Sequence, residues 1–535
     1  MGNAASIRSD VELTADVLVI GGGPAGTWAA LTAAAQGASV VLVDKGYCGT
    51  SGATAPSGTG VWYVEPTEEQ REAAMKSREA LGGYLADRGW MKRVLDRTYS
   101  NMNDLALAGY PFPVDDEGKS YRRSLQGPEY MKLMRRRVRK AGVRILDHSP
   151  ALELLADEHG VGGASGVRTE TGETWTVKAG AVIIASGGCA FLSKALGCNV
   201  LTGDGYLIAA EAGASLSGME FSNAYAISPT FSTVTKTAFY TWATFYYEDG
   251  TVIEGAGSQQ GRSVIARTLQ TQPVYARLDR ATEDMRSWMR AAQPNFFLSF
   301  DRIGIDPFTQ LFPVTLRLEG TVRGTGGIHL IDESCATAVP GLYAAGDAAT
   351  RQFICGGFTG GGSHNAAWAM SSGSWAGEAA AVYAVTLGGR RERREPKGAG
   401  SERQVSALAS AGDVQEWTAA VKREVEPFDI NLFRTEATLT QSVGRLNGLW
   451  RTVQHALAPN ASDAVKLREA QAMTATARWM YASALARRET RGMHKRLDYP
   501  GADAAQHYRL LTGGLDEIWV KPETAALSRL EVNQS

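Results

Sequence analysis

The stretch DVLVIGGGPAGTWAALTAAAQGASVVLVD, residues 16–44, decides the fold of this 535-residue chain. Four apolar residues follow Asp16 and end at glycine, which is typical of a buried strand. A helix is predicted from Pro24 to about Gln36, and a second buried strand from Ser39 to Val43. The order of strand, glycine-rich turn, helix and strand predicts an α/β fold.

The glycines of this stretch follow the pattern G-x-G-x-x-G, and each has a physical role. Gly21 permits a tight turn, Gly23 lets the backbone approach a pyrophosphate, and Gly26 lets the helix pack closely on its strand. The pyrophosphate is expected at the helix N-terminus, where unpaired N–H groups and the helix dipole attract anions. Asp44 ends the second strand, where a carboxylate can hold ribose hydroxyls. The stretch therefore predicts a dinucleotide-binding site.

The composition argues against several classes of protein. A net charge of −1 does not suit a broad nucleic-acid surface. The five cysteines include no C-x-x-C pair, so neither a disulfide framework nor an iron–sulfur cluster nor another metal site is expected in this chain. No apolar run of about 18 residues occurs, and the segment MGNAASIRSD lacks the apolar core of a secretory signal. We therefore expect a cytoplasmic protein with no integral membrane segment.

Two later segments repeat the theme of an apolar strand that ends in glycine. Residues 181–188 read AVIIASGG, and residues 341–348 read GLYAAGDA. A glycine-dense loop at 355–365 then opens a long helix to about Leu387. The free N–H groups at the start of such a helix suit the electron-rich edge of a ring.

The segment ARRETRGMHKRLDYP, residues 486–500, looks like the motif A-R-x-E-S-R-G-x-H-x-R-x-D-Y-P of the succinate dehydrogenase and fumarate reductase flavoprotein superfamily. TGDG at 202–205 and Met219-Glu220-Phe221 agree with this resemblance. The loop TSGATA at 50–55 looks closer to the adenylylsulfate reductase alpha subunit. The resemblance implies a Rossmann-like FAD-binding domain with an inserted α+β capping domain and a C-terminal helical domain.

The expected domain boundaries follow changes in composition along the chain. Residues 239–250, FYTWATFYYEDG, begin an aromatic section that we expect to fill a core, with a substrate pocket as the alternative. We place a flexible leader at 1–15, the FAD-binding domain at 16–222 and 326–387, the capping domain at 223–325, a linker at 388–412 and the helical domain at 413–535.

The resemblance implies non-covalent FAD, because Gly52 stands where respiratory members of the superfamily carry the histidine that bonds the flavin. Asp347 would hydrogen-bond the ribityl chain, and the amides near 362–365 would face the flavin N1–C2=O2 edge, with His364 as a neutral imidazole. The residues predicted to contact FAD are Gly21, Gly23, Pro24, Ala25, Gly26, Asp44, Lys45, Thr50, Ser51, Gly52, Ser186, Gly187, Asp204, Gly346, Asp347, Gly362, Ser363, His364 and Asn365.

The sequence differs from the superfamily's pattern in the segments that bind the substrate. Members that act on succinate or fumarate carry a histidine after the E-F motif, an R-G-E-G-G arginine and an H-G-A-N-R segment. The matching regions here read FSNAYAISPT, EGAGSQQGR and CGGFTGG. Two buried carboxylates need bidentate arginines, because no other side chain neutralises and orients them as well. Succinate and fumarate are therefore not expected as substrates.

Four cationic or titratable residues are candidates for catalysis by their position in the sequence. Arg351 is the preferred binder of an anionic substrate, and Arg323 and Arg262 are further candidates. His329 would act as an acid or base, with a histidine satisfied by a backbone carbonyl as the alternative. His494 is expected, together with Arg491, to join the helical domain to the flavin domain without any part in the chemistry.

These observations predict an FAD-dependent oxidoreductase that moves a hydride or two electrons between a small polar substrate and flavin N5. Two alternatives stay open. One is the flavoprotein subunit of an adenylylsulfate-reductase-like complex, which would exchange electrons with a separate ferredoxin-like iron–sulfur protein. The other is a non-catalytic flavin-binding protein, suggested by the missing dicarboxylate clamp.

Overall fold

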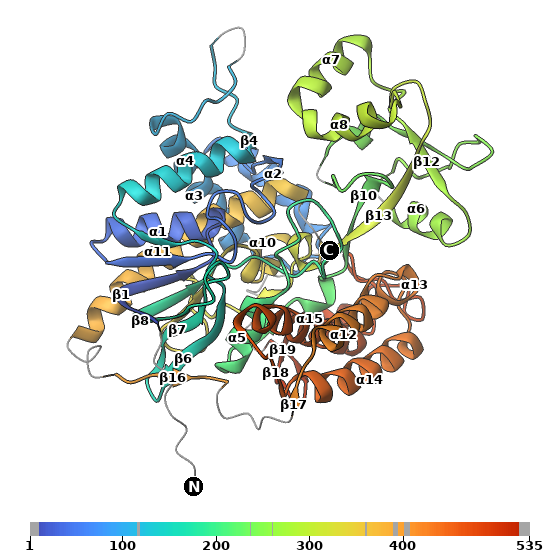
Figure 1. Ribbon diagram of the computed structural model, residues 1–535. Coiled ribbons are helices and arrows are strands. Elements are labelled where there is room, and N and C mark those ends of the chain that lie inside the picture. Colours follow the sequence, from blue (N-terminus) through green and yellow to red (C-terminus); the bar gives the residue numbers. More distant parts are fainter. Residues whose placement is uncertain are drawn as a thin grey trace.

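The computed structural model describes residues 10–114, 118–235, 237–258, 261–358, 361–388, 394–400 and 407–523. The chain forms three parts in Figure 1: a large sheet covered by helices, a smaller part in yellow-green to one side, and a group of helices in orange and red. The prediction of an α/β chain with a capping domain and a helical C-terminal part is confirmed.

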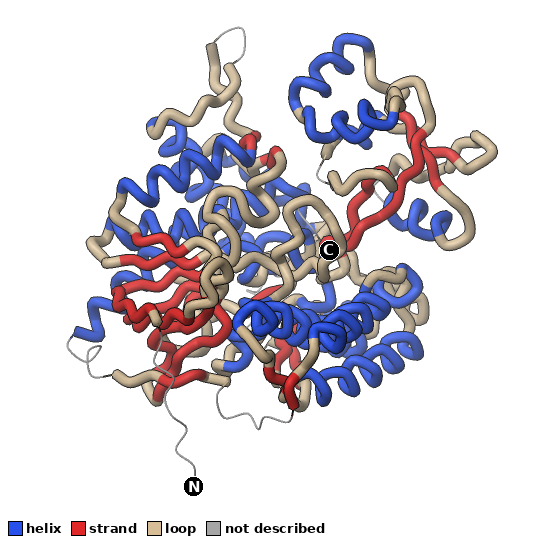
Figure 2. Tube along the Cα trace, viewed as in Figure 1, coloured by secondary structure: helices blue, strands red, loops and turns tan. Residues whose placement is uncertain are grey.

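The main sheet brings the predicted strand tips to one edge. β1 (Val11–Ile20) pairs in parallel with β2 (Val40–Val43) on one side and with β8 (Thr174–Ile184) on the other. β15 (Leu342–Ala344) also pairs in parallel with β8. In each pairing the last residues of the two strands are opposite each other, so four carboxyl ends meet at this edge. In Figure 2 the loops, in tan, gather between the main sheet and the other two parts.

The remaining strands extend the sheet at both edges. Residues 394–400, which the sequence places in a linker, carry a short edge strand. Arg394 anchors this segment, because its guanidinium bonds both oxygens of Asp157 at 2.6 and 2.7 Å. The strands are β5 (Arg144–Leu146) beside β2, and then β7 (Gly160–Val167), β6 (Ala151–Asp157) and β16 (Lys397–Gly398) beyond β8.

Two helices cover the centre of the sheet and pack closely on each other. α1 (Pro24–Ala35) follows β1, and the long α11 (Gly361–Leu387) follows the glycine-dense loop. A Cβ added at Gly373 or Gly377 of α11 would lie 2.3 or 2.2 Å from a carbonyl oxygen of α1, so glycine is needed at this contact. The smaller elements of this part are α2 (Glu68–Glu79), α3 (Arg88–Leu107), α4 (Gly127–Lys140), α5 (Asp204–Glu211), α9 (Gly320–Arg323), α10 (Gln352–Cys355), β3 (Gly58–Gly60) and β4 (Ser124–Gln126).

The capping part is an antiparallel sheet with helices beside it. Phe239, Phe245 and Tyr246 of the aromatic stretch are buried, as expected for core residues, and Phe239 packs against Phe296 with ring centroids 5.5 Å apart. Its elements are β10 (Ala224–Pro229), β11 (Thr244–Tyr246), α6 (Gly261–Leu269), β12 (Val274–Arg277), α7 (Glu283–Ala292), α8 (Pro294–Ile303) and β13 (Phe312–Glu319).

The C-terminal part is mainly helical, and the last elements that the structure describes are strands. β19 (Leu510–Gly513) and β20 (Trp519–Pro522) pair, and β19 also pairs with β9 (Leu216–Ser217), which in turn pairs with β14 (Gly327–Ile328). None of the described helices is both long and apolar enough to cross a membrane. The helices and strands before β19 are β17 (Ala407–Leu408), α12 (Ala411–Val425), α13 (Phe428–Asn431), α14 (Glu436–Val453), β18 (Ala456–Leu457) and α15 (Ala461–Ala486).

A buried ion network forms where the 486–500 segment meets the FAD-binding part. Arg487 is fully buried and lies 2.8 Å from Glu220 and 2.9 Å from Glu489. Glu489 also pairs with Arg491 at 2.7 Å. Burial raises the pKa of Glu220, and Arg487 opposes this shift. Charges buried this deeply are tolerated only when they are paired, so the network holds the two parts in one arrangement.

His494 belongs to the same network as a neutral imidazole. Burial and the nearby Arg434 and Arg487 hold the pKa of His494 well below its ordinary range. Arg434 Nη1 donates to His494 Nδ1 at 2.8 Å, so the ring proton is on Nε2, which donates to the Arg487 carbonyl at 3.1 Å. Arg491 Nη1 donates to the Gly83 carbonyl at 2.7 Å. These contacts support the joining role expected for Arg491 and His494.

The substitution Arg487→Met tests the network. It removes the cation between two buried carboxylates, so we expect the free energy of unfolding to fall by about 3–5 kcal/mol and the thermal midpoint to fall with it. Arg423→Met is the matched control, because Arg423 pairs with Glu416 at 2.7 Å while both side chains are exposed. Its loss should stay below about 1 kcal/mol. Equal thermal midpoints for the two variants would contradict a stabilising role for the network.

Candidate FAD and substrate site

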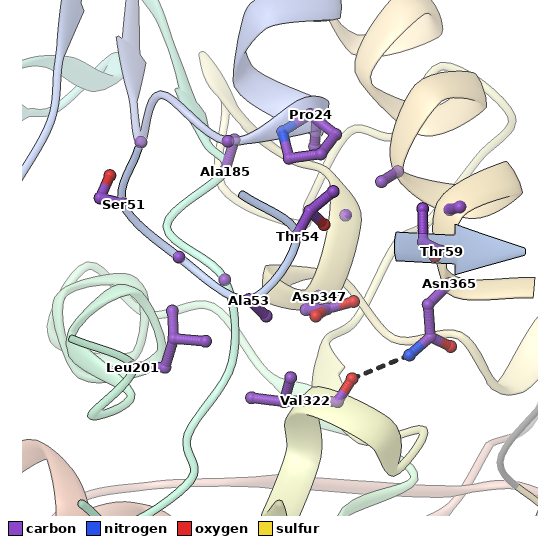
Figure 3. A pocket seen from close by; sticks show the side chains of 18 of the residues that line it. Pro24, Ser51, Ala53, Thr54, Thr59, Ala185, Leu201, Val322, Asp347 and Asn365 are labelled. Carbon is purple, nitrogen blue, oxygen red and sulfur yellow. Dashed lines mark hydrogen bonds between the residues drawn. The ribbon is translucent and has the colours of Figure 1, made fainter. Parts of the chain in front are cut away.

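A cavity of about 570 Å³ lies at the edge where the four strands end. Its walls come from the loops after β1, β2, β8 and β15, from the start of α11, from α9 and from the capping part. Figure 3 shows Pro24, Ala185, Asp347 and Asn365 around the same space, although they are far apart in the sequence. The fold therefore brings the three predicted strand-tip motifs to one site.

Asp44 is held in a fixed orientation at one end of the cavity. Its Oδ2 accepts a hydrogen bond from the Gly22 amide at 2.5 Å. Its Oδ1 accepts from the Gly46 amide at 2.8 Å and from Ser51 Oγ at 2.7 Å. The side chain is almost fully buried but lines the cavity. A carboxylate positioned in this way suits the ribose hydroxyls of an adenosine.

Lys45 lies beside Asp44 and has its charge matched by two carboxylates. Lys45 Nζ is 2.7 Å from Asp204 Oδ2 and 2.5 Å from Glu469 Oε1, and it donates to Thr202 Oγ1 at 3.0 Å. Burial acts to lower the pKa of Lys45, but the two carboxylates outweigh it and the pKa is raised. Glu469 is on α15, so this contact also ties the C-terminal helices to the cavity wall. No local sequence signal points to Glu469.

The glycine-rich turn has the shape that a pyrophosphate needs. A Cβ on Gly21 would lie 2.3 Å from the Ala185 carbonyl oxygen, and one on Gly26 would lie 1.8 Å from the Gly21 carbonyl oxygen. A Cβ on Gly23 would meet no described protein atom within 4 Å, because Gly23 faces the cavity. Ser186 Oγ also lines the cavity and is buried without a hydrogen-bond partner among the described residues. This cradle fits the diphosphate of a dinucleotide.

The opposite end of the cavity is formed by α11 and α9. Asn365 Nδ2 donates to the Val322 carbonyl at 2.9 Å, which is the dashed line in Figure 3. Asn365 Oδ1 is buried and has no hydrogen-bond partner in the described part of the chain. The Ser363 carbonyl accepts from the Trp62 amide at 3.1 Å, and the buried His364 ring lies 4.3 Å from the Trp62 ring. The start of α11 therefore offers polar atoms to a ring bound here.

The structure places most of the predicted cofactor residues on the cavity wall. Gly26, Thr50 and His364 are not among the described lining residues. The prediction for Gly362 lies outside the residues whose burial is described, and Thr359 and Gly360 of the preceding loop lie outside the described residues. The predicted residues that line the cavity are Gly21, Gly23, Pro24, Ala25, Asp44, Lys45, Ser51, Gly52, Ser186, Gly187, Asp204, Gly346, Asp347, Ser363 and Asn365.

Arg351, the preferred binder of an anionic substrate, does not line the cavity. Its guanidinium is 1% exposed and pairs with Asp347. Its Nη2 donates to the carbonyls of Thr321 and Val322 at 2.9 and 3.1 Å, and also to that of Gly324. This arrangement fixes Asp347 and α9 in place, and it does not support direct contact between Arg351 and a substrate.

His329 also lies away from the cavity wall. Its Nε2 is 3.8 Å from Glu523 Oε1 in the C-terminal segment. Burial lowers the pKa of His329, Glu523 opposes the shift and Arg509 adds to it. A largely buried histidine that does not line the cavity does not support the role of an acid or base on a substrate.

Of the two remaining candidates, Arg323 lines the cavity and Arg262 is not among the described lining residues. Arg323 lines the wall and pairs with the buried Glu319 at 3.2 Å. Arg262 lies in the first turn of α6 in the capping part, and no hydrogen bond or ion pair within the described chain holds its guanidinium. The surrounding protein and the like charge of Arg323 lower the pKa of Arg262 to about 10, against the attraction of Glu319, although the residue keeps an exposed surface. With a pKa of about 10, the Arg262 guanidinium stays charged at neutral pH.

Several residues of the wall carry no motif that sequence reasoning could use. They come from the loop at 53–60 and from the capping part, where Thr237, Ala238 and Phe239 of one segment and Ala292 and Gln293 of another meet the cavity. Their side chains are small or common in cores, so only the folded arrangement identifies them.

Comparison with known proteins agrees with this site. The family model described as FAD binding domain matches residues 16–231, and the one described as Fumarate reductase flavoprotein C-term matches residues 426–529. One subunit of the fumarate reductase (CoM/CoB) of Methanothermobacter marburgensis is 25% identical over 538 residues, which cover 91% of this chain and 94% of the relative. L-aspartate oxidase of Mycobacterium bovis is 27% identical over 559 residues, which cover 94% and 96%.

Solved structures share the fold over almost the whole chain. FrdA from a mutant E. coli quinol fumarate reductase matches with a TM-score of 0.81 at 20% identity, over 96% of this chain and 97% of that chain. Adenylylsulfate reductase of Archaeoglobus fulgidus matches with a TM-score of 0.75 at 19% identity, over 96% of both chains. The likeness of fold therefore does not single out the adenylylsulfate reductase branch.

The cradle, the cavity and the capping part define an FAD-dependent oxidoreductase. The matches to both family models agree with the predicted resemblance to the succinate dehydrogenase and fumarate reductase flavoprotein superfamily. FAD as the cofactor is likewise confirmed.

The substitution Gly23→Ala tests the cradle. Its backbone, with φ −73° and ψ −171°, is accessible to alanine, and the added methyl group meets only the cavity. We expect the apoprotein to keep its thermal midpoint while its affinity for FAD falls at least about tenfold, which corresponds to about 1.4 kcal/mol. FAD titration followed by flavin fluorescence measures this change.

Two further glycines control this experiment. Gly444→Ala on α14 also adds a methyl group to open space, and it should leave the affinity for FAD unchanged. Gly26→Ala should destabilise even the apoprotein, because its Cβ overlaps the Gly21 carbonyl oxygen. If Gly23→Ala and Gly444→Ala bind FAD equally well, the assignment of Gly23 to the pyrophosphate is wrong.

Proposed function

We propose that this oxidoreductase moves a hydride or two electrons between a small polar substrate and flavin N5, beneath the capping part. The observation that carries the proposal is the continuity of the cavity. It runs from Asp44 and the glycine turn to α9, and there the capping part supplies Thr237 to Phe239 and Ala292 to Gln293. A reacting molecule at this end would be shielded from water by the capping part. FAD supplies the redox chemistry, and the protein supplies orientation and charge.

We further propose roles for the residues at the two ends. The cofactor residues on the wall bind FAD, with Asp44 at the ribose, Gly23 at the pyrophosphate and Asn365 at the ring. Arg323, with Arg262 beside it, binds the substrate. Arg351 acts as a positioning residue, because it holds Asp347 and the carbonyls of α9. FAD is bound non-covalently, since Gly52 on the wall offers no side chain for a bond.

The substrate we propose is neither succinate nor fumarate. Arg351 is sequestered, and Lys45 is paired with two carboxylates at the other end of the site. The second proposal, an electron-transferring flavoprotein with a separate iron–sulfur partner, is favoured by relatives that are themselves subunits of fumarate reductases.

A flavin reduction screen tests the function. The holoprotein should be yellow, and acid precipitation should leave the yellow colour in the supernatant. Under anaerobic stopped-flow mixing, we expect a small organic acid or amine to bleach the oxidised flavin, or to reoxidise the flavin after reduction by dithionite. Failure of every substrate together with reduction by a ferredoxin would favour the second proposal. If no substrate or protein donor reduces or reoxidises the flavin, the oxidoreductase proposal is contradicted.

A further inference from the structure

Three tryptophans contact one another behind the part of the cavity wall that α11 forms. Trp368 and Trp375 are seven residues apart on α11, which places them on one face of the helix, two turns apart. Trp90 of α3 contacts both, with its ring centroid 5.7 Å from that of Trp368 and 5.9 Å from that of Trp375. Aromatic rings at this separation meet edge to face. The three indoles therefore form one continuous group of π systems.

The inner end of this group reaches the wall of the FAD cavity. Trp368 is fully buried, and its Nε1 donates a hydrogen bond to the Gly346 carbonyl at 3.0 Å. Gly346 lines the cavity, and so do Asn365 and Ala369, which precede and follow Trp368 in α11. One backbone carbonyl thus separates the Trp368 indole from a residue of the wall.

The outer end of the group lies next to the protein surface. Trp90 is partly exposed, and Trp375 keeps 7% of its surface exposed. The Arg93 guanidinium lies 5.2 Å from the centre of the Trp90 ring and 4.3 Å from that of Trp375. A cation beside an indole disfavours a positive charge on the ring, so it favours loss of the N–H proton once the ring has been oxidised. Arg93 would therefore trap an oxidised indole as a neutral radical at this end.

The neighbouring helices hold the rings in fixed contact. Asn101 Nδ2 of α3 donates to the Met370 carbonyl and to Ser374 Oγ of α11, both at 3.1 Å. Trp90 also stacks on Phe353 of α10, with ring centroids 4.9 Å apart. Fixed contact matters for redox chemistry, because the rate of electron tunnelling falls exponentially with the distance between two rings.

We propose that Trp368, Trp90 and Trp375 form a one-electron relay between the flavin and the protein surface at Arg93. Indole is among the most easily oxidised side chains, and oxidised FAD becomes a strong one-electron oxidant when it absorbs blue light. One electron passes from Trp368 to the excited flavin, and one electron from Trp90 then refills Trp368. The oxidised site ends on Trp90 and Trp375, where one indole proton is lost to water. The flavin has then gained one electron, and the surface pair has lost one electron and one proton.

The relay depends on the proposed function only for the position of FAD in this cavity, and it needs no substrate. Packing alone would also explain buried aromatic residues, because large rings commonly fill cores. The two explanations differ in what light does to the protein. A relay moves the oxidised site away from the flavin, and electron return from the flavin to a more distant indole is slower.

Laser flash excitation of the FAD-loaded protein under nitrogen, followed by the transient absorption of tryptophan radicals, tests the relay. The unsubstituted protein should give a long-lived tryptophan radical. Dissolved ascorbate should remove this radical at a rate that rises with the ascorbate concentration, because the radical ends at the surface. Absence of a long-lived tryptophan radical, or a radical that ascorbate does not reach, would overturn the proposal.

Two variants interrupt the relay at different points. Trp368→Phe removes the first donor, so the long-lived radical should be lost. Trp90→Phe removes the link to the surface and changes no residue of the described cavity wall, so we expect the radical to decay at least about tenfold faster. Trp90→Phe therefore carries the test if Trp368→Phe does not retain FAD. Unchanged decay of the radical in Trp90→Phe would overturn the proposal.

Two further variants control for tryptophans outside the relay. Trp479→Phe is the matched control, because Trp479 of α15 is also fully buried and its Nε1 donates to a carbonyl, that of Gly514, at 2.8 Å. It should leave the yield and the lifetime of the radical unchanged. Trp62→Phe tests a rival donor, since the Trp62 ring lies 4.3 Å from the His364 ring at the start of α11. Loss of the long-lived radical in Trp62→Phe, with none of this effect in Trp90→Phe, would assign the electron path to Trp62.

The relay and the proposed function fail in different ways. If light produces the long-lived radical but no substrate or protein donor changes the redox state of the flavin in the dark, the proposed function is wrong and the relay stands. If a substrate bleaches or reoxidises the flavin while light produces no long-lived tryptophan radical, the relay is wrong and the proposed function stands.

Discussion

Parallel pairing of β1 with β2 on one side and β8 on the other determines where every later motif must lie. Because β15 joins β8 with its carboxyl end level with the others, four strands open onto one edge. Backbone N–H groups, glycine turns and the N-terminus of α1 are therefore concentrated there, and an anionic dinucleotide is the ligand that such an edge binds best. The capping part and the C-terminal helices then close the space around it.

Most of the charged groups near this site serve to hold the parts together. Arg487, Glu220, Glu489 and Arg491 form a network with little or no exposure to solvent, and Arg351 is equally buried against α9. Removing a charge from water is costly, so these groups persist where the pairing is complete. Arg487, Arg491 and His494 of the motif at 486–500 all belong to this network. Among the described residues of the wall, Arg323 and Lys45 are the cations, and each is paired with a carboxylate.

Sequence reasoning was most successful where structure is local. The strand, turn, helix and acid of 16–44 follow from hydrophobic pattern and glycine spacing, and β1, α1 and β2 confirm these elements. The leader predicted at 1–15 is wrong at its end, because β1 begins at Val11. The sequence predicts catalytic residues less well, because position along the chain says little about which way a side chain points. Arg351 and His329 flank the correct loops, but Arg351 pairs with Asp347 and His329 lies 3.8 Å from Glu523.

The remaining features depend on contacts between distant segments. β19 is short and acquires its partners from β9 and β20, so no periodicity of its own reveals it. Glu469 meets Lys45 only after α15 packs on the FAD-binding part. Thr237 to Phe239 line the cavity from a segment that otherwise resembles ordinary core. Each of these follows from tertiary packing, which overrides local preference.

The most direct test of this account is an experimental structure of the protein with FAD bound. The account predicts the adenosine end at Asp44, the pyrophosphate over Gly23 at the N-terminus of α1, and the flavin ring between Asn365 and the capping part, near Arg323. A ring located at the Asp44 end, or FAD bound outside this cavity, would contradict it.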